Sequence, residues 1–353
     1  MPLPISLRIV AVTIVAIATN LAADEYPAVK VTNIRRVFHN GEHNAFTDLV
    51  RFKGKYYLTF RSCPDGHMVH PTASVIILTS NDARKWQPVH RFRVRHRDTR
   101  DPHFLVFKGK MFLYTGTWYS GAKTIPPSQY DLNKHLGYAA WSADGKKWHS
   151  PIMLDGTFGH YIWRAATFGG KAYLCGRRKI EFDVRPRGEG KQVESLMLES
   201  DDGLIFRKRA VFQPIEGDET AFLFKKDGSI IGIGRRGSRT AQLLTSKAPY
   251  TKWQRSDLGR YIGGPLIARW GEALIVGGRK RMGGRGSKMS MYWLAGDKLR
   301  EFAELPSGGD TSYPGFIALS PTRAIMSWYS SHEKNNKGKQ ITAIYMADLH
   351  ITK

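Results

Sequence analysis

The sequence is short of cysteine, of acidic residues and of long hydrophobic segments. Its 353 residues include two cysteines, Cys63 and Cys175, so the chain holds either one disulfide or two partly buried free thiols. No Cys/His spacing resembles a zinc site, and no clustered carboxylate loop calls for a cation. We therefore assign no metal ligand, leave metal dependence undetermined, and expect no cofactor. Signals for helices are nearly absent as well, which favours an all-β chain.

The longest hydrophobic run lies at the N-terminus and is too short to cross a membrane. Met1–Arg8 carries one arginine, Ile9–Ala18 is apolar, and Asn20–Ala23 ends in the small residues that suit cleavage. This order is typical of a secretory signal peptide rather than of a transmembrane helix. We therefore predict a signal peptide over 1–23, one mature domain over 24–353, and a periplasmic or extracellular protein without stable membrane insertion.

Basic residues outnumber acidic ones by 54 to 30, which gives a formal net charge of +24. Such a charge first suggests a nucleic acid as partner. Lys and Arg are spread along the whole chain, however, without a basic arm, a basic helix or a known nucleic-acid motif, and export argues against an intracellular role. We expect no nucleic-acid partner. The charge indicates either a solvated basic surface or attraction to an acidic or sulfated glycan.

A pair of short apolar strands joined by a Gly-containing or polar turn recurs along the chain. Each copy predicts a β-hairpin, and repetition at such a period indicates a repeat architecture. The copies are 49–58, 105–113, 166–174, 222–231, 266–274 and a degenerate one at 316–326.

A second repeated element follows several of these hairpins and has the pattern Ser-x-Asp-x-x-x-aromatic. It occurs at Ser80–Trp86, Ser142–Trp148 and Ser200–Phe206, with a looser relative at Ser246–Trp253. These segments resemble the Asp-box of sialidase-type propellers, where the Asp and Gly form a turn between the third and fourth strands. The resemblance implies a structural role, and we assign no catalysis to these aspartates.

The repeats together predict an all-β, six-bladed β-propeller with a sialidase-like fold. The last blade, Gly315–Leu349, shows three strands, and Val29–Phe38 can supply the fourth. Such an N-terminal strand would close the ring and leave no free sheet edge. Rings of five or seven blades are the alternatives.

The residues just before and just after each hairpin are expected to face the central channel. Arg, His, Glu and Tyr converge there from separate blades, either as hydrated lining or as a site for an anion, which guanidinium groups hold in two-point contact. Examples before the hairpins are His43, Asn44, Arg100, Asp101, Arg164, Glu219 and Tyr313, and those after them are Arg61, Arg177, Arg235 and Arg279.

One of these segments carries a family resemblance. Asp218–Ala221, followed by Asp227-Gly228 and then Arg235, is similar to the fourth-blade pattern of bacterial exo-sialidases. The resemblance implies that Glu219 partners a nucleophilic tyrosine, and that Arg235 belongs to a set of arginines that bind a carboxylate. Arg279, at the matching strand end of the next blade, resembles another member of that set.

Tyr313, which opens the last blade between Gly308-Gly309 and Pro314, resembles the nucleophile of the same family. The implied mechanism is retaining. A phenol deprotonated by Glu219 avoids the repulsion that an Asp or Glu nucleophile would meet from a carboxylate beside the anomeric carbon.

The first blade departs from the family pattern, because Ala45 stands where the first arginine of the set would fall. The loop after its second strand offers Asp65, His67 and His70 as a general acid/base, and an imidazole titrates close to neutrality. The entries around His43 and around Arg100–Pro102 look like those of secreted sialidase-like proteins of glycan degradation.

The leading hypothesis is an exported, retaining exo-glycosidase that acts on a sialic acid, a uronate or a sulfated glycan. Tyr313 would be the nucleophile and Glu219 its base, with Asp65, His67 or His70 as acid/base. The residues expected to bind substrate are Arg235, Arg279, Arg61, Arg100, Asp101, Arg164, His43 and Asn44.

Two other hypotheses use the same residues. A polysaccharide lyase would neutralise a uronate with arginine and cleave by β-elimination, with Tyr and His as base and acid. A non-catalytic glycan-binding propeller would account for the missing first arginine. In each case the partner is an anionic carbohydrate, and we expect a monomer.

Overall fold

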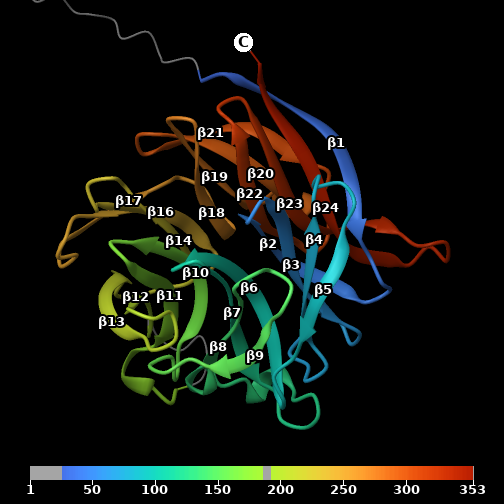
Figure 1. Ribbon diagram of the computed structural model, residues 1–353. Helices are drawn as coiled ribbons and strands as arrows, with labels where there is room; N and C mark the ends of the chain where they lie inside the picture. The colour runs from blue at the N-terminus through green and yellow to red at the C-terminus, as the bar shows by residue number, and fades with distance from the viewer. Residues whose placement is uncertain (1–25, 186–191, 353) are drawn as a thin grey trace, which may run out of the picture.

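The computed structural model describes residues 26–185 and 192–352, which form six antiparallel sheets of four strands arranged in a ring (Figure 1). This confirms the all-β, six-bladed propeller. The predicted signal peptide over 1–23 lies outside the described residues. Within the part that is described, no helix is long and apolar enough to cross a membrane.

The strands follow one another blade by blade, each sheet pairing in chain order except the last. Blade 1 is β2 (His43–Phe52), β3 (Lys55–Cys63), β4 (Ser74–Ser80) and β5 (Gln87–Phe92). Blade 2 is β6 (Arg97–Phe107), β7 (Lys110–Tyr119), β8 (Leu136–Ser142) and β9 (His149–Met153). Blade 3 is β10 (Tyr161–Phe168), β11 (Lys171–Lys179), β12 (Val193–Ser200) and β13 (Arg207–Gln213).

The second half of the ring has the same plan. Blade 4 is β14 (Thr220–Phe224), β15 (Ile230–Arg236), β16 (Arg239–Ser246) and β17 (Trp253–Asp257). Blade 5 is β18 (Gly263–Trp270), β19 (Ala273–Arg281), β20 (Ser287–Ala295) and β21 (Lys298–Leu305). Blade 6 is β22 (Thr311–Ser320), β23 (Arg323–Lys334), β24 (Gln340–Thr352) and β1 (Ala28–Phe38). Short 3-10 turns occur at Pro127–Gln129, Leu132–Lys134, Ile180–Phe182 and Gly283–Arg285.

The two ends of the described chain close the ring. β1 pairs antiparallel with β24, from Ala28 opposite Thr352 to Phe38 opposite Ile344, and the two strands run side by side in Figure 1. The predicted closing strand Val29–Phe38 is therefore confirmed. Each of these backbones satisfies the hydrogen bonds of the other, so neither is left as an open edge.

The Ser-Asp segments form the same turn between the third and fourth strands of the first three blades. In the second blade, Oδ1 of Asp144 accepts from the backbone N–H of Lys146 and of Lys147, both at 2.8 Å, while Ser142 Oγ accepts from Gly145 N–H at 2.8 Å. Gly145 has a φ of +74°, and a Cβ there would collide with Tyr57 of the neighbouring blade. The carboxylate thus serves the turn and lies away from the channel.

The innermost strands of five blades share a β-bulge where they enter the channel. The register shifts between Ala45 and Asp48 in β2, and at the corresponding place in β6, β10, β18 and β22. Four bulged residues have a positive φ: Phe46 (+65°), Asp101 (+53°), Gly264 (+57°) and Tyr313 (+56°). A bulge turns its side chain out of the alternating pattern, and residues other than glycine pay for this conformation.

Cys63 and Cys175 are both buried and free. Of the two alternatives left by the sequence, the free thiols are the observed one, and both are buried more completely than expected. Burial raises the pKa of the Cys175 thiol to about 11, so this group stays protonated at neutral pH and behaves as a small apolar side chain.

Candidate active site

A pocket of about 270 Å³ opens at the end of the channel where the bulged residues lie. Charged or phenolic side chains reach its wall from every blade, so no single blade holds the site. Examples of these side chains, one from each blade in order, are His67, Asp101, Arg177, Glu219, Arg279 and Tyr313.

The central feature of the pocket is a hydrogen bond between Tyr313 and Glu219. The phenol donates to Oε1 of Glu219 at 2.5 Å, and Oε2 accepts from Arg235 Nη1 at 2.7 Å and from Gly264 N–H at 3.0 Å. Three donors therefore converge on one buried carboxylate. Such contacts to an ionised group are among the stronger hydrogen bonds of proteins.

The two partners are held in opposite protonation states. Burial, together with the negative charge of Glu219, raises the pKa of Tyr313 well above its ordinary value. Burial alone would also raise the pKa of Glu219, but Arg235, Arg177 and the hydrogen bonds outweigh it and lower that pKa to about 2. At neutral pH a neutral phenol therefore faces a carboxylate that can take its proton.

Aromatic rings and one glycine fix the position of Tyr313. Its ring meets Phe46 and Trp163 edge to face, with centroids 4.8 Å and 4.7 Å away. A Cβ on Gly264 would lie 2.7 Å from the Tyr313 ring and 2.6 Å from Ser312 Oγ. The ring thus packs directly against bare backbone, which only glycine permits.

Three guanidinium groups enter the pocket from the same strand position in consecutive blades. Arg177 on β11, Arg235 on β15 and Arg279 on β19 each stand near the end of the second strand. Two of these arginines share the carboxylate of Asp218. Arg177 Nη1 donates to Asp218 Oδ1, and Arg235 Nε lies 3.4 Å from Asp218 Oδ2.

Arg279 is less neutralised than the other two. Its Nη2 donates to the Tyr261 hydroxyl at 3.2 Å, and its Nη1 is 3.8 Å from Asp310 Oδ1, too far for a hydrogen bond. The guanidinium therefore retains donors for an anion that enters the pocket.

Asp101 brings a second kind of carboxyl group into the site. Its Oδ2 accepts from the Tyr161 hydroxyl, and its Oδ1 is buried without a hydrogen-bond partner among the described residues. Burial raises the pKa of Asp101 to about 7, although Arg100 nearby acts in the opposite direction. Unlike Glu219, Asp101 thus keeps a proton close to neutrality.

Arg61 and Arg100, both predicted to bind substrate, hold the loop that carries His67. Arg61 is fully buried and bonds to both oxygens of Asp98, at 3.0 Å and 2.7 Å, and to the carbonyl of Met68 at 3.0 Å. Arg100 lines the pocket, but it donates to Asp98 and to the carbonyl of His67 at 3.0 Å. Arg61 therefore donates through all three of its nitrogens inside the protein, and Arg100 does so through Nε and Nη2.

Arg164 and Asn44 also lie away from the pocket wall. Arg164 is buried in the ring, where it donates to Asp48 Oδ1 at 2.9 Å and to the Pro314 carbonyl at 2.7 Å. Asn44 is fully buried and donates to Asn40 Oδ1 at 3.0 Å. Both tie the first blade to other segments and do not line the pocket.

The three acid/base candidates of the first-blade loop separate clearly. His67 lines the pocket. Asp65 is exposed and accepts from Thr72 Oγ1 at 2.5 Å, and His70 has its Nδ1 2.9 Å from Thr124 Oγ1. Neither Asp65 nor His70 belongs to the pocket wall.

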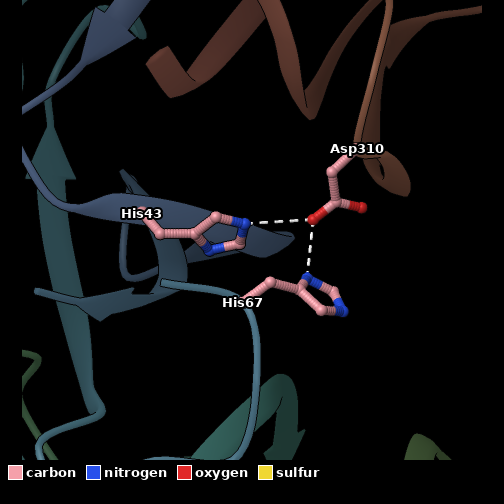
Figure 2. Close-up of side chains that lie close together, drawn as sticks. All are labelled: His43, His67 and Asp310. Carbon is pink, nitrogen blue, oxygen red and sulfur yellow. Dashed lines mark hydrogen bonds and ion pairs between the residues drawn. The ribbon is translucent and has the colours of Figure 1, made fainter. Parts of the chain in front are cut away.

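His43 lies beside this loop. Its Nε2 is 3.0 Å from Asp310 Oδ2, and His67 Nδ1 is 2.7 Å from the same oxygen (Figure 2).

Asp310 was not singled out as a site residue from the sequence, and neither were Asp218 and Tyr161. Arg177 had a detectable signal, because it occupies the strand end that Arg235 and Arg279 occupy in the next two blades. Asp218 opens the Asp218–Ala221 segment that carries the family resemblance, whereas Asp310 and Tyr161 carry no local pattern that distinguishes them from ordinary polar residues.

Solved structures show what this arrangement resembles. A protein of unknown function from Dyadobacter fermentans superposes with a TM-score of 0.76 at 18% identity, covering 93% of this chain and 100% of its own. Trypanosoma rangeli sialidase in complex with the inhibitor DANA has a TM-score of 0.66 at 11% identity, covering 91% of this chain. The endosialidase of phage phi92 has a TM-score of 0.62 at 8% identity, covering 91% of this chain and 69% of its own.

These likenesses are likenesses of fold. The chain spans 59% of the length of the trypanosomal sialidase. No protein-family model matches the chain, and no curated protein matches it. Six blades, the closing strand and the superpositions agree on one statement: the chain is a six-bladed β-propeller with a sialidase-like fold.

Proposed function

We propose that this protein is an exported exo-glycosidase that removes a terminal anionic sugar from a glycan with retention of configuration, using Tyr313 as nucleophile. The observation that carries the proposal is the Tyr313–Glu219 hydrogen bond of 2.5 Å inside a pocket that four arginines line. A buried phenol with a carboxylate acceptor is an activated nucleophile, and arginines beside it select a negatively charged substrate.

The pocket suits a single terminal sugar. Its volume of about 270 Å³ is small, and its walls come from all six blades, which favours one sugar unit over a longer segment of chain. The carboxylate or sulfate of the sugar binds to Arg279, whose charge is the least neutralised by neighbouring carboxylates, and then to Arg235 and Arg177. This contact places the anomeric carbon next to the Tyr313 hydroxyl.

The first step forms a covalent glycosyl-tyrosine. The Tyr313 oxygen attacks the anomeric carbon while its proton passes to Glu219. The bond from the anomeric carbon to the leaving oxygen breaks, and that oxygen receives the proton of Asp101. Asp101 fits this role because it lines the pocket, has one unpartnered oxygen and keeps its proton near neutrality through burial.

The second step releases the sugar. Asp101, now a carboxylate, takes a proton from a water molecule whose oxygen attacks the anomeric carbon. The bond to Tyr313 breaks, and the phenolate recovers its proton from Glu219. Two displacements at one carbon retain the configuration, and both carboxyl groups return to their starting states.

Substrate binding itself changes the pKa of the base, Glu219. In the free protein, Arg235 and Arg177 keep the pKa of Glu219 near 2, which makes it a weak proton acceptor. An anionic sugar that draws on the same guanidinium groups offsets their positive charge. The pKa of Glu219 then rises toward that of a useful base, so proton transfer from Tyr313 is coupled to the arrival of an anionic substrate.

The proposal is tested with a panel of sialosides, oligouronates and sulfated oligosaccharides. We expect release of a free terminal sugar from one class, with a new reducing end, no new ultraviolet absorbance, and a mass increase on the Tyr313 peptide when a slow fluorinated analogue is used. A product that absorbs as an unsaturated uronate would instead identify a lyase. Binding without any product would identify a glycan-binding propeller, and either result would overturn the proposal.

A further inference from the structure

Two histidines and one aspartate converge on a single point at the rim of the pocket. His43 opens β2, His67 lies in the loop after β3, and Asp310 immediately precedes β22, so three separate segments supply them. Figure 2 shows both imidazole rings turned toward the same carboxylate oxygen. One ring nitrogen of each histidine and that oxygen all lie within 4.8 Å of one another.

Two of the distances in this cluster lie near the shorter edge of a metal coordination shell, and the third, between the two histidine nitrogens, is within 4.8 Å. Zn²⁺ binds His nitrogen and Asp oxygen at roughly 2.0–2.2 Å. Two such ligands are then about 3 Å apart at a right angle and about 3.4 Å apart at a tetrahedral angle. The nitrogen of His43 is 3.0 Å and that of His67 2.7 Å from Asp310 Oδ2, so small side-chain movements make room for an ion.

We propose that His43, His67 and Asp310 bind one divalent transition-metal ion of the Zn²⁺ type at the rim of the pocket. Two histidines and one carboxylate are a recurrent ligand set for such ions and leave coordination positions open. On binding, the ion takes the places of the ring protons that otherwise join the imidazoles to Asp310, and each neutral imidazole then carries its proton on its other ring nitrogen.

Surrounding groups already hold two of the three ligands, Asp310 and His67, in position. The Tyr329 hydroxyl donates to Asp310 Oδ1 at 2.8 Å, which leaves Oδ2 turned toward the histidines. The loop of His67 is tied down by Arg100, which donates to the His67 carbonyl at 3.0 Å. Groups that orient ligands in this way typically add 10–100-fold to metal affinity.

The charge around the cluster specifies what would complete the coordination shell. One carboxylate neutralises half of a divalent charge, and the positive guanidinium of Arg279 is 3.8 Å from Asp310. An anionic fourth ligand is therefore favoured. Because His67 and Asp310 both line the pocket, that ligand would be the carboxylate or sulfate of the bound sugar. This assignment rests on the proposed function, whereas the metal site does not.

Metal binding is measured without substrate, on the mature protein after treatment with a chelator. Titration with Zn²⁺ in a calorimeter should give one equivalent, and Co²⁺ should show visible d–d absorbance. H43Q and H67Q should each bind Zn²⁺ at least tenfold more weakly. The matched control is H332Q, because His332 lies beside Gly308 at the same end of the last blade and contacts Ser330 rather than the cluster.

A second readout covers the case in which a variant is poorly folded. His67 is about half exposed, so H67Q should fold, and its melting temperature should stay constant on addition of Zn²⁺ while that of the wild type rises. The site is overturned if the wild type binds no more Zn²⁺ than the H43Q/H67Q double variant, or if H332Q loses as much affinity as H67Q. Y313F should bind Zn²⁺ normally, so this result is independent of catalysis.

Discussion

The hydroxyl of Tyr313 donates to Oε1 of Glu219 at 2.5 Å, although 94 positions and two blade boundaries separate these residues in the chain. The contact depends on two local devices. Tyr313 sits on a bulge at a φ of +56°. Glu219 stands just before the inner strand of its own blade, where Arg235 and Gly264 both donate to Oε2 and leave Oε1 to the phenol. An acceptor already in place for the phenolic proton is the kind of preorganisation that catalysis uses.

Removing the hydroxyl of Tyr313 should abolish turnover. We expect Y313F to lower kcat by about a thousandfold or more, because no other group takes over the attack on the anomeric carbon. Sugar release from the best substrate of the panel provides the measurement. Y57F is the control, since Tyr57 is buried in the first blade outside the pocket. Wild-type turnover by Y313F would exclude a tyrosine nucleophile.

Arg279 should recognise the charge of the substrate. R279M is expected to raise the Kd for an anionic sugar by about 10–100-fold, the equivalent of one lost charge-assisted hydrogen bond, and to leave binding of the uncharged methyl ester unchanged. The adjacent K280M is the matched control, because Lys280 Nζ contacts Glu301 at 2.6 Å and Glu304 at 2.7 Å on the outer side of the strand. Equal losses for the acid and the ester would contradict the assignment.

Asp101 should make the stability of the fold depend on pH. Burial raises its pKa to about 7 from an ordinary 3.8, so between these values the native state holds a proton that the unfolded chain has released. The contribution of Asp101 to the free energy of unfolding is therefore fully present below about pH 4, and it declines as the pH rises toward 7.

The D101N variant has no such proton. Measured by urea unfolding, the stability of the wild type relative to D101N should fall from pH 5 to pH 8. Parallel pH curves for the two proteins would show that Asp101 titrates in its ordinary range, and would remove it as the proton donor of the first step.

Gly264 should be needed for the position of Tyr313 rather than for the backbone alone. G264A would place a Cβ 2.7 Å from the Tyr313 ring, whereas G259A would meet open space. Both glycines have a positive φ, +57° and +67°, so both variants carry a backbone cost of roughly 1 kcal/mol. We expect G264A alone to lose activity, by tenfold or more, with unfolding free energy as the second measurement. Equal activities would show that the ring can shift without consequence.

Much of the fold was predictable because propeller blades are local structures. Each hairpin joins neighbours in the chain, and the Ser-Asp turns repeat their own short pattern, so periodicity alone indicates strands, turns and the number of blades. The closing strand was predictable for a related reason: a sixth blade with three strands leaves an edge that another strand must cover.

The sequence predicted only some of the residues that form the pocket. Glu219, Arg235, Arg279 and Tyr313 stand at strand ends that all blades share, and the structure brings them to one pocket. Arg61 occupies the same strand end in the first blade, yet it is fully buried against Asp98. Strand position predicts which residues approach the channel. It does not predict which of them are buried in an ion pair instead of lining the pocket.

The sequence by itself therefore determined the all-β propeller, its six blades and the positions from which a tyrosine, a carboxylate and arginines could reach the channel. Only the tertiary structure decided the chemistry of the site. It raised the pKa of Asp101 and lowered that of Glu219, and it gathered His43, His67 and Asp310 at one point. The physical reason is that burial and the distance between charges control protonation and metal binding, and both quantities arise only when distant segments pack together.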